Sequence, residues 1–208
     1  MYVNAILKDS ECEIVMDSEL LELKKYIRER LKLDFIVPDE LLEMSLYMEQ
    51  LTSFMDEHLK GNLRREDDKI LTKAMINNYT KNHLLTPPEK KRYDRDHLIH
   101  LIYIYYLKNV ISIDDVKKLL NLLDSADVHG EELFDVYEKT FEMEKQQYFN
   151  IESSVMKAAQ ITDKKIPKDE NEQLNKMIFI FLLGYDIFSK KRLIEKLIDE
   201  LPEEDLDD

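Results

Sequence analysis

Basic and amide side chains gather in two short clusters between residues 72 and 95 of an otherwise acidic chain. The first cluster comprises Thr72, Lys73, Asn77, Asn78 and Lys81. The second comprises Lys90, Lys91, Arg92 and Arg95. Steps of three and four residues place the lysines and asparagines of the first cluster near one face of a helix.

The side chains of both clusters suit contacts with DNA. Asparagine can pair with adenine in the major groove, and lysine can hydrogen-bond to guanine or phosphate. Lysine and arginine of the second cluster could hold neighbouring phosphates. The two clusters therefore predict an interface for double-stranded DNA.

The distribution of charge supports this interpretation. The whole chain carries 30 Lys and Arg against 44 Asp and Glu, a net charge of −14. Residues 60–110 carry eleven basic and six acidic side chains, so this stretch has a net charge of +5 and the remainder −19. A basic island on an acidic protein suits phosphate binding, because the rest of the surface repels nucleic acid and orients its approach. The alternative explanation is a solvated charge cluster without a ligand.

Other kinds of site have little support in the sequence. The single cysteine, Cys12, excludes an intrachain disulfide and a multi-cysteine metal site, and it fits a reducing compartment. The N-terminal residues lack the features of a secretory signal, so we expect a cytoplasmic protein. The most apolar stretches, 97–113 and 177–188, are interrupted or too short to span a membrane. His97 and His100 have no third metal ligand nearby in sequence, so we expect no metal, no cofactor and no enzymatic activity.

The composition and periodicity predict an all-α fold. Only 3 Gly and 5 Pro occur in 208 residues, which leaves few sites for hairpin turns. Apolar residues recur at helical spacing in seven segments: 17–31, 38–61, 72–81, 94–109, 112–123, 130–160 and 172–201. Helix starts are expected at Asp17 or Ser18, at Thr72, and at Ser112, whose hydroxyl can cap the N–H of Asp115. Residues 162–171 are expected to form a linker and residues 202–208 an acidic, solvated tail. The last helix is apolar on nearly all sides and is expected at the centre of its domain.

The order of residues around the two clusters resembles the DNA-reading half of MerR-type winged helix-turn-helix regulators. Thr72 matches the family's helix cap, Ile76 its buried leucine, Asn78-Tyr79 its tyrosine pair and His83-Leu84-Leu85 its Gly-Leu-Leu corner. Lys91-Arg92-Tyr93 is similar to the Arg-x-Tyr element that ends the family's wing, and residues 112–116 are similar to the start of its next helix. The stretch resembles more closely still a bacterial domain family of unknown function that shares this helix-turn-helix arrangement.

The length of the wing and three positions depart from the regulators. The wing between Leu85 and Tyr93 is several residues short, and Ala74 and Asn77 stand where arginine is usual. His83 replaces the corner glycine; in a left-handed backbone conformation histidine is tolerated at a higher cost than glycine.

The resemblance implies a MerR-like helix-turn-helix domain with a shortened wing over residues 36–123. A helical extension would precede it at 1–35, and a helical region for dimerisation or effector binding would follow at 124–208. Its function would be DNA binding as a transcriptional regulator, and its partners would be duplex DNA and a second copy of the chain. The alternative is an all-helical protein-protein interaction module that has lost DNA binding.

Aromatic residues at helical spacing admit two explanations. They could line a pocket for a small effector, or they could pack in the core, which is the usual role of such a stripe. The residues concerned are Tyr103, Tyr105, Tyr106, Phe134, Tyr137, Phe141 and Tyr148.

Overall fold

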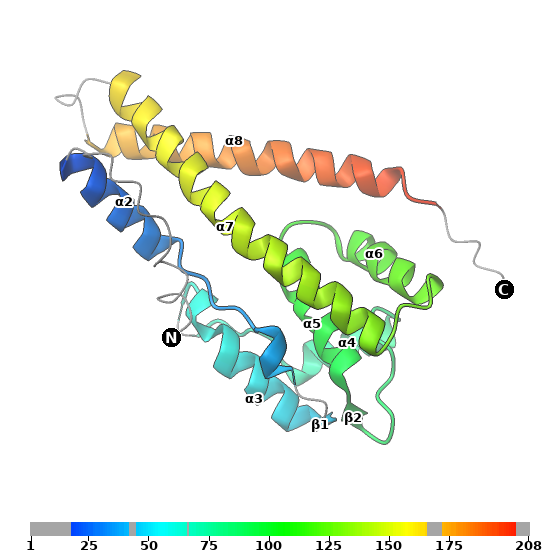
Figure 1. Ribbon diagram of the computed structural model, residues 1–208. Helices are drawn as coiled ribbons and strands as arrows, with labels where there is room; N and C mark the ends of the chain where they lie inside the picture. The colour runs from blue at the N-terminus through cyan, green and yellow to red at the C-terminus, as the bar shows by residue number, and fades with distance from the viewer. Residues whose placement is uncertain (1–17, 42–44, 66, 166–171, 203–208) are drawn as a thin grey trace. The chain divides into compact units, whose positions relative to one another are not determined.

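The computed structural model describes residues 18–41, 45–65, 67–165 and 172–202, and this part of the chain is mostly helical (Figure 1). The α-helices are α2 (Ser18–Arg30), α3 (Met48–Leu59), α4 (Lys73–Lys81), α5 (Arg95–Leu107), α6 (Ile113–Ser125), α7 (Glu131–Lys165) and α8 (Glu172–Asp199). The remaining elements are the 3-10 turns Pro38–Glu40 and Lys60–Asn62 and the two-residue strands β1 (Leu46–Tyr47) and β2 (Arg92–Tyr93). The expectation of a mainly helical chain is confirmed.

The chain forms two compact units that are interleaved in sequence. One unit contains Met1–Leu33 and Lys145–Tyr185, and the other contains Asp34–Glu144 and Asp186–Asp208. We call them the terminal unit and the central unit. All residues of the two predicted DNA-binding clusters belong to the central unit.

The central unit is built around α5. Its residues Leu98, Ile99, Leu101, Ile102 and Ile104 are fully or almost fully buried, so this helix is apolar on most sides. Buried residues of α3 and α4 join the same cluster, namely Leu51, Met55, Leu59, Ile76 and Tyr79. The antiparallel pair β1–β2 aligns Leu46 with Tyr93 and Tyr47 with Arg92. This pair connects the segment before α3 to the segment before α5.

Four helix starts and stops agree with the sequence. Thr72, Asp94 and Ser112 cap α4, α5 and α6, and each side chain accepts a hydrogen bond from the backbone N–H three residues later. Helix α3 ends close to Gly61, as predicted. A Cβ atom at Gly61 would lie 2.3 Å from Asp34 Oδ2, and the Gly61 N–H donates to that oxygen at 2.6 Å, so a larger residue would have to displace the Asp34 carboxylate.

The prediction of one helix from Pro38 to Gly61 is wrong. Pro38 opens a single 3-10 turn, Leu46–Tyr47 forms a strand, and the helix starts only at Met48. The reason is the pairing of Leu46 with Tyr93, which holds this stretch extended by contacts with a distant segment. The predicted linker also starts too early, because α7 continues to Lys165. Asp17, residues 166–171 and residues 203–208 lie outside the described residues.

The aromatic stripe of α7 packs within the central unit at Tyr137 and Phe141. Tyr137 is 5% exposed, and its hydroxyl donates to the backbone oxygen of Ile36 at 2.6 Å. The Tyr103 ring meets the Tyr137 ring edge-on at 6.1 Å, and the Phe35 ring meets that of Phe141 at 6.4 Å. Core packing is therefore the correct explanation for these two residues of the stripe.

The prediction that the last helix occupies the centre of its domain is wrong. Helix α8 exposes large apolar side chains along its length, including Ile180 (56%), Phe181 (64%) and Phe188 (58%).

The terminal unit is held by an ion pair between α2 and α7. Glu152 is 5% exposed, Arg28 Nε donates to it at 2.8 Å, and Lys24 Nζ lies 3.8 Å from it. Among the described residues of this unit, the buried apolar side chains are Ile27 and Ala159. The described part of this unit therefore has a small apolar core.

Candidate nucleic-acid interface

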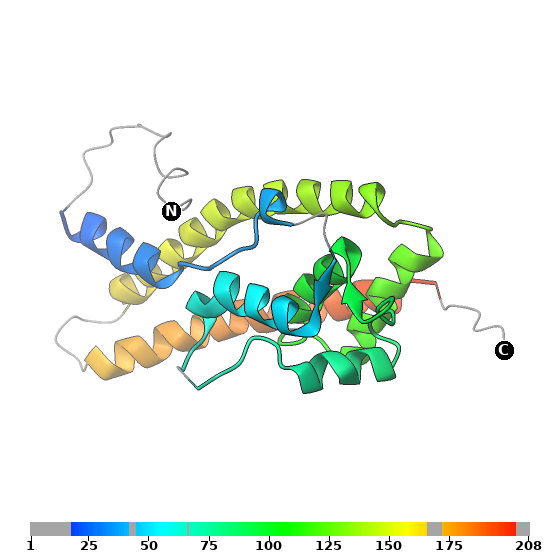
Figure 2. The same cartoon turned by 90° about the horizontal axis from the view of Figure 1, so that it is seen from below.

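Helix α4 presents the first cluster to solvent. The helix starts at the Thr72 cap, where the Met75 N–H donates to Thr72 Oγ1 at 3.2 Å. Its buried side is formed by Ile76 and Tyr79. The opposite side is exposed and carries Lys73, Asn77, Asn78 and Lys81. Figure 2 shows α4 as the short teal helix below α3, which it contacts. The sequence correctly separates the buried and exposed sides of this helix.

A left-handed corner fixes the end of α4. His83 has a φ of 55°, and the backbone N–H groups of Leu84 and Leu85 both donate to the Tyr79 carbonyl, at 2.9 and 3.3 Å. Leu84 and Leu85 are buried. His83 therefore adopts the left-handed conformation in which histidine costs more than glycine, and the corner anchors the helix through two buried leucines.

The second cluster lies on a tight turn. The Arg92 N–H donates to the Glu89 carbonyl at 2.9 Å, and the two central residues, Lys90 and Lys91, have φ angles of 49° and 65°. Positive φ at both central positions defines a type I′ turn, which normally uses Asn and Gly. Both lysine side chains are exposed. The turn therefore projects two cations from a backbone that disfavours lysine.

Arg92 and Arg95 are held by neighbouring residues. The Arg92 guanidinium lies 4.7 Å from the centre of the Tyr47 ring and within 3.4 Å of the Tyr47 hydroxyl and Ser45. Arg92 is nevertheless exposed beside the turn. Arg95 Nη2 donates to Glu131 at 2.7 Å, and its guanidinium lies 4.5 Å from the Phe134 ring centre. Only 14% of the Arg95 side chain is exposed, so it serves the contact between α5 and α7.

Lys73 has a partner at the surface. Its ammonium group forms an ion pair with Glu49 at the start of α3, and this hydrogen bond lowers the pKa of the Glu49 carboxyl. Both side chains are more than half exposed, so water screens the pair. Lys73 can therefore exchange Glu49 for a phosphate at little cost.

Three further exposed cations were not predicted as contacts from the sequence pattern. Arg64, Arg65 and Lys69 are exposed in the loop between α3 and α4. They contribute to the positive charge of residues 60–110, but they belong to no helical pattern that would have assigned them a role. Their position in the loop leading into α4 makes them candidate phosphate contacts.

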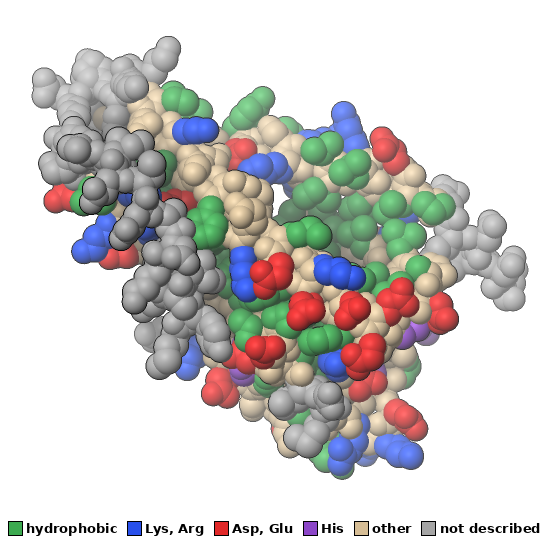
Figure 3. Space-filling model, viewed as in Figure 1, with side chains coloured by type: hydrophobic (Ala, Val, Ile, Leu, Met, Phe, Trp, Pro, Cys, Tyr) green, Lys and Arg blue, Asp and Glu red, His purple; other side chains and the backbone are tan. Residues whose placement is uncertain are grey.

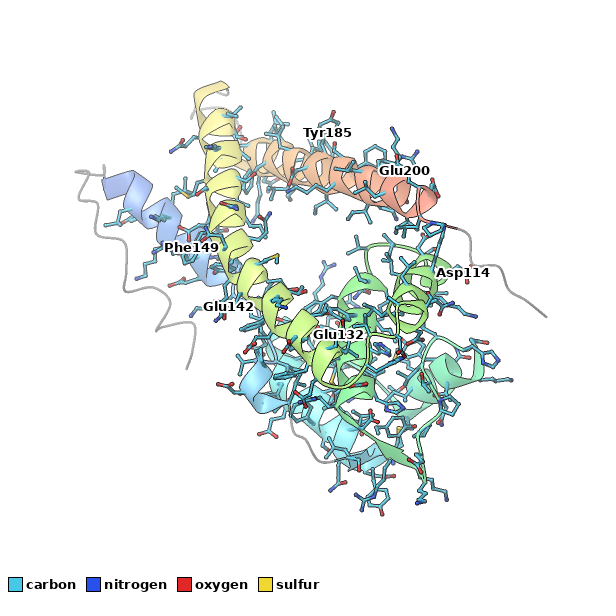
Figure 4. The ribbon with its side chains drawn as sticks, turned by 45° about the vertical axis from the view of Figure 1, so that its right-hand side comes forward. Asp114, Glu132, Glu142, Phe149, Tyr185 and Glu200 are labelled. Atoms are coloured by element: carbon cyan, nitrogen blue, oxygen red, sulfur yellow. The ribbon has the colours of Figure 1, made fainter. Side chains whose placement is uncertain are left out.

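Acidic side chains gather on other elements of the central unit. The α7 segment 131–144 carries six acidic residues and one lysine. Figure 3 shows the red acidic side chains aligned over this segment, and Figure 4 labels Glu132 and Glu142 on it and Asp114 on α6. Helix α4, in contrast, contains no acidic residue. The positive charge of the central unit is therefore concentrated on α4 and the turn, because the loop before α4 carries Asp67 and Asp68 beside its cations.

Two further observations concern metal binding and membrane insertion. Among the residues that the structure describes, no three His, Cys, Asp or Glu side chains are grouped closely enough to hold a metal ion. No helix in the same part of the chain combines the length and hydropathy needed to cross a membrane.

The candidate interface coincides with a domain that is defined by sequence comparison. A family model described as a domain of unknown function (DUF1836) matches residues 36–141. The match covers half of the chain and contains every candidate residue, and the chain belongs to this family. The expected kinship with a domain family of unknown function is thereby confirmed. Neither the curated proteins nor the solved structures include a match to this chain.

Proposed function

We propose that the central unit binds double-stranded DNA as a MerR-like winged helix-turn-helix and that the protein is a transcriptional regulator. Helix α4 is the recognition helix, with Asn77, Asn78 and Lys81 toward the base edges. The turn of Lys90 and Lys91 is a shortened wing that contacts the phosphate backbone, with Arg92 beside it. The observation that carries the proposal is the pair of exposed lysines at positive φ.

These lysines are informative because the fold gains nothing from them. A type I′ turn is satisfied best by Asn and Gly, and a side chain in the left-handed region costs roughly 1–2 kcal/mol per residue. Both side chains are exposed, and Lys90 forms an ion pair with its neighbour Glu89 at 3.9 Å. Strained residues cluster at functional sites. Binding of a phosphate group would explain why the turn carries two lysines in place of Asn and Gly.

The order of elements supports the winged helix-turn-helix interpretation. Helix α3 precedes α4 and contacts it, the left-handed corner ends α4, and the turn leads through β2 into α5. Strand β2 pairs with β1, which comes directly before α3, so the turn is tied to the start of the first helix. This arrangement would hold a recognition helix and a wing in a fixed relation.

A second candidate function is an interaction module for another protein. The observations that favour it are the ion pair of Lys73 with Glu49, the net charge of −14, and Ala74 and Asn77 at positions that are arginine in the regulators. Each of these weakens attraction to DNA without disturbing the fold.

The salt dependence of binding to a random-sequence duplex separates the two functions. If Lys90, Lys91 and Arg92 each hold one phosphate, the logarithm of the affinity should fall with the logarithm of the salt concentration with a slope of about −3. Fluorescence anisotropy of a labelled duplex between 50 and 200 mM salt measures this slope. A protein with no salt-sensitive affinity for any duplex would sink the DNA-binding proposal and favour the interaction module.

Asn77→Ala should reduce preference for a selected DNA site and leave background affinity intact. Loss of a bidentate base contact costs about 1–3 kcal/mol on the preferred site. Asn78 Oδ1 already accepts a hydrogen bond from Asn82 at 3.2 Å, so Asn78→Ala should have the smaller effect. The preferred site would come from repeated selection out of a random duplex pool. Equal losses on selected and random duplexes would exclude base reading by Asn77.

A further inference from the structure

Helix α4 carries a stripe of four exposed residues along one face. The stripe starts at Ala74 and continues three, four and seven positions later with Asn77, Asn78 and Lys81. Residues at these steps lie one above the other on a helix. The buried side of α4 faces away from the stripe, toward the core of the central unit. Ala74 therefore belongs to the same surface as the asparagines that were predicted to contact bases.

The stripe lacks the residue that most often reads guanine. Arginine makes the commonest specific contact to guanine in the major groove, and α4 contains no arginine. Lys73 comes just before the stripe and is paired with Glu49. Lys81 is the last residue of the helix, whereas the N-terminal residues of a recognition helix contact the base edges. The first part of the stripe, Ala74 and Asn77, is thus the part best placed to set the base preference.

Ala74 offers a methyl group to the groove. In the major groove, thymine is the base that presents a methyl group, and an apolar contact from alanine is one of the ways in which proteins recognise it. Ala74 is the second residue of α4 and is exposed. Its short side chain would let the start of the helix approach the base edges closely.

Asn77 offers the second contact, to adenine. A carboxamide can accept a hydrogen bond from adenine N6 and donate one to N7. Within the described part of the chain the Asn77 side chain forms no hydrogen bond, whereas Asn78 accepts one from Asn82 at 3.2 Å. Ala74 and Asn77 are about 4.5 Å apart along the helix axis, close to the spacing of about 3.4 Å between base pairs. One helix can therefore meet a thymine methyl and an adenine edge within one base-pair step.

We infer that the DNA sites read by α4 contain A·T pairs at one base step, where Ala74 contacts a thymine methyl and Asn77 pairs with adenine. The inference rests on the proposed function, because it names the sequence class that the same helix would read. Ala74 is then a specificity-determining residue, although its position is arginine in the regulators. Alanine there changes which base is preferred and does not abolish binding.

Replacement of thymine by uracil tests the contact of Ala74. Uracil pairs like thymine and lacks only the C5-methyl group. Duplexes selected from a random pool should share an A·T step, and a copy with uracil at this step should bind the unmodified protein about fourfold more weakly. This is the effect expected when one methyl group is lost from an apolar contact. Uracil outside the step is the control and should leave the affinity unchanged.

Two variants assign the contacts to their residues. Ala74→Gly removes the methyl group from the protein and should bind the thymine and uracil duplexes equally. Met75→Gly is the matched control, since it also puts glycine into α4 but lies outside the stripe, and it should keep the fourfold difference. A duplex with 7-deazaadenine, which lacks the N7 acceptor, should bind the unmodified protein about tenfold more weakly. Asn77→Ala should not distinguish this duplex from the adenine duplex.

The unmodified protein decides the inference, because the change of duplex cannot disturb its fold. Equal binding of the thymine and uracil duplexes would show that Ala74 only favours helix formation, as alanine does in any helix. This result, or selected sites with G·C pairs at the step, would overturn the inference while salt-sensitive binding to random duplex still supported the proposed function. A protein without salt-sensitive affinity for any duplex would overturn both.

Discussion

Replacing Lys90 with Asn and Lys91 with Gly is expected to stabilise the protein and to weaken its binding to DNA. Asn-Gly is the preferred pair for a type I′ turn, so the double variant relieves two strained residues, φ 49° and 65°. The free energy of unfolding should rise by roughly 1–2 kcal/mol, since glycine also adds freedom to the unfolded chain. Affinity for random duplex at 50 mM salt should fall about 100-fold, because each lost phosphate contact costs about tenfold through counterion release.

The opposite signs of the two effects make this variant decisive. A substitution that damaged the fold would lower both the stability and the affinity for DNA. The double variant keeps the backbone of the turn and removes only its charge, so thermal unfolding and anisotropy titrations on the same preparation separate the two causes. The slope of affinity against salt should also become less negative by about two.

A matched control removes two positive charges elsewhere. Lys25 on α2 and Lys157 on α7 are exposed and belong to the terminal unit. Lys25→Gln with Lys157→Gln changes the net charge by the same amount, and it should leave the affinity and the salt slope nearly unchanged. Similar losses in the two double variants would show that overall charge, and not the turn, governs binding.

Elements with local signals could be predicted from the sequence. The caps at Thr72, Asp94 and Ser112 follow from one side chain and its backbone neighbour, so spacing alone locates them. The buried and exposed sides of α4 follow from periodicity within nine residues. The resemblance places His83 at a corner that is glycine in the regulators, and the left-handed conformation found there is one that favours glycine.

Features that depend on distant partners could not be predicted. Leu46 and Tyr47 become a strand because Tyr93 and Arg92 pair with them across the chain. The sequence pattern predicts that Arg95 contacts phosphate. In the folded chain its guanidinium group pairs with Glu131 and stacks on Phe134 of α7. The apolar sequence of α8 predicts burial, but periodicity does not say whether the covering surface belongs to the same chain. Backbone strain at Lys90 and Lys91 likewise becomes visible only in the folded turn.

A buried histidine gives the central unit a dependence on pH. His100 of α5 is 5% exposed, and its Nε2 atom has no hydrogen-bond partner in the described part of the chain. Burial lowers the pKa of His100; Asp124 and Asp96 oppose this shift, while His97 and His129 reinforce it. The folded protein therefore keeps His100 neutral at a pH where the unfolded chain is already protonated, near the ordinary pKa of about 6.5.

Lowering the pH from 7 to 5 should therefore reduce the free energy of unfolding. The reason is that His100 binds a proton in the unfolded chain but stays neutral in the folded protein. The loss should be at most about 1.4 kcal/mol per pH unit. The Asp94 carboxyl, whose pKa is lowered by its bonds to His97 despite its burial, titrates below this window. Burial raises the pKa of the Glu144 carboxyl, so its protonation in the folded protein opposes the loss, and the variant at His100 isolates the histidine's share. His100→Leu removes the buried imidazole and should flatten the dependence between pH 7 and 5. His83→Asn, which removes an exposed histidine and tolerates the left-handed backbone, should leave it intact. Urea unfolding of the three proteins at several pH values measures how the free energy of unfolding changes with pH. Equal changes for the parent chain and His100→Leu would show that His100 is protonated in the folded state.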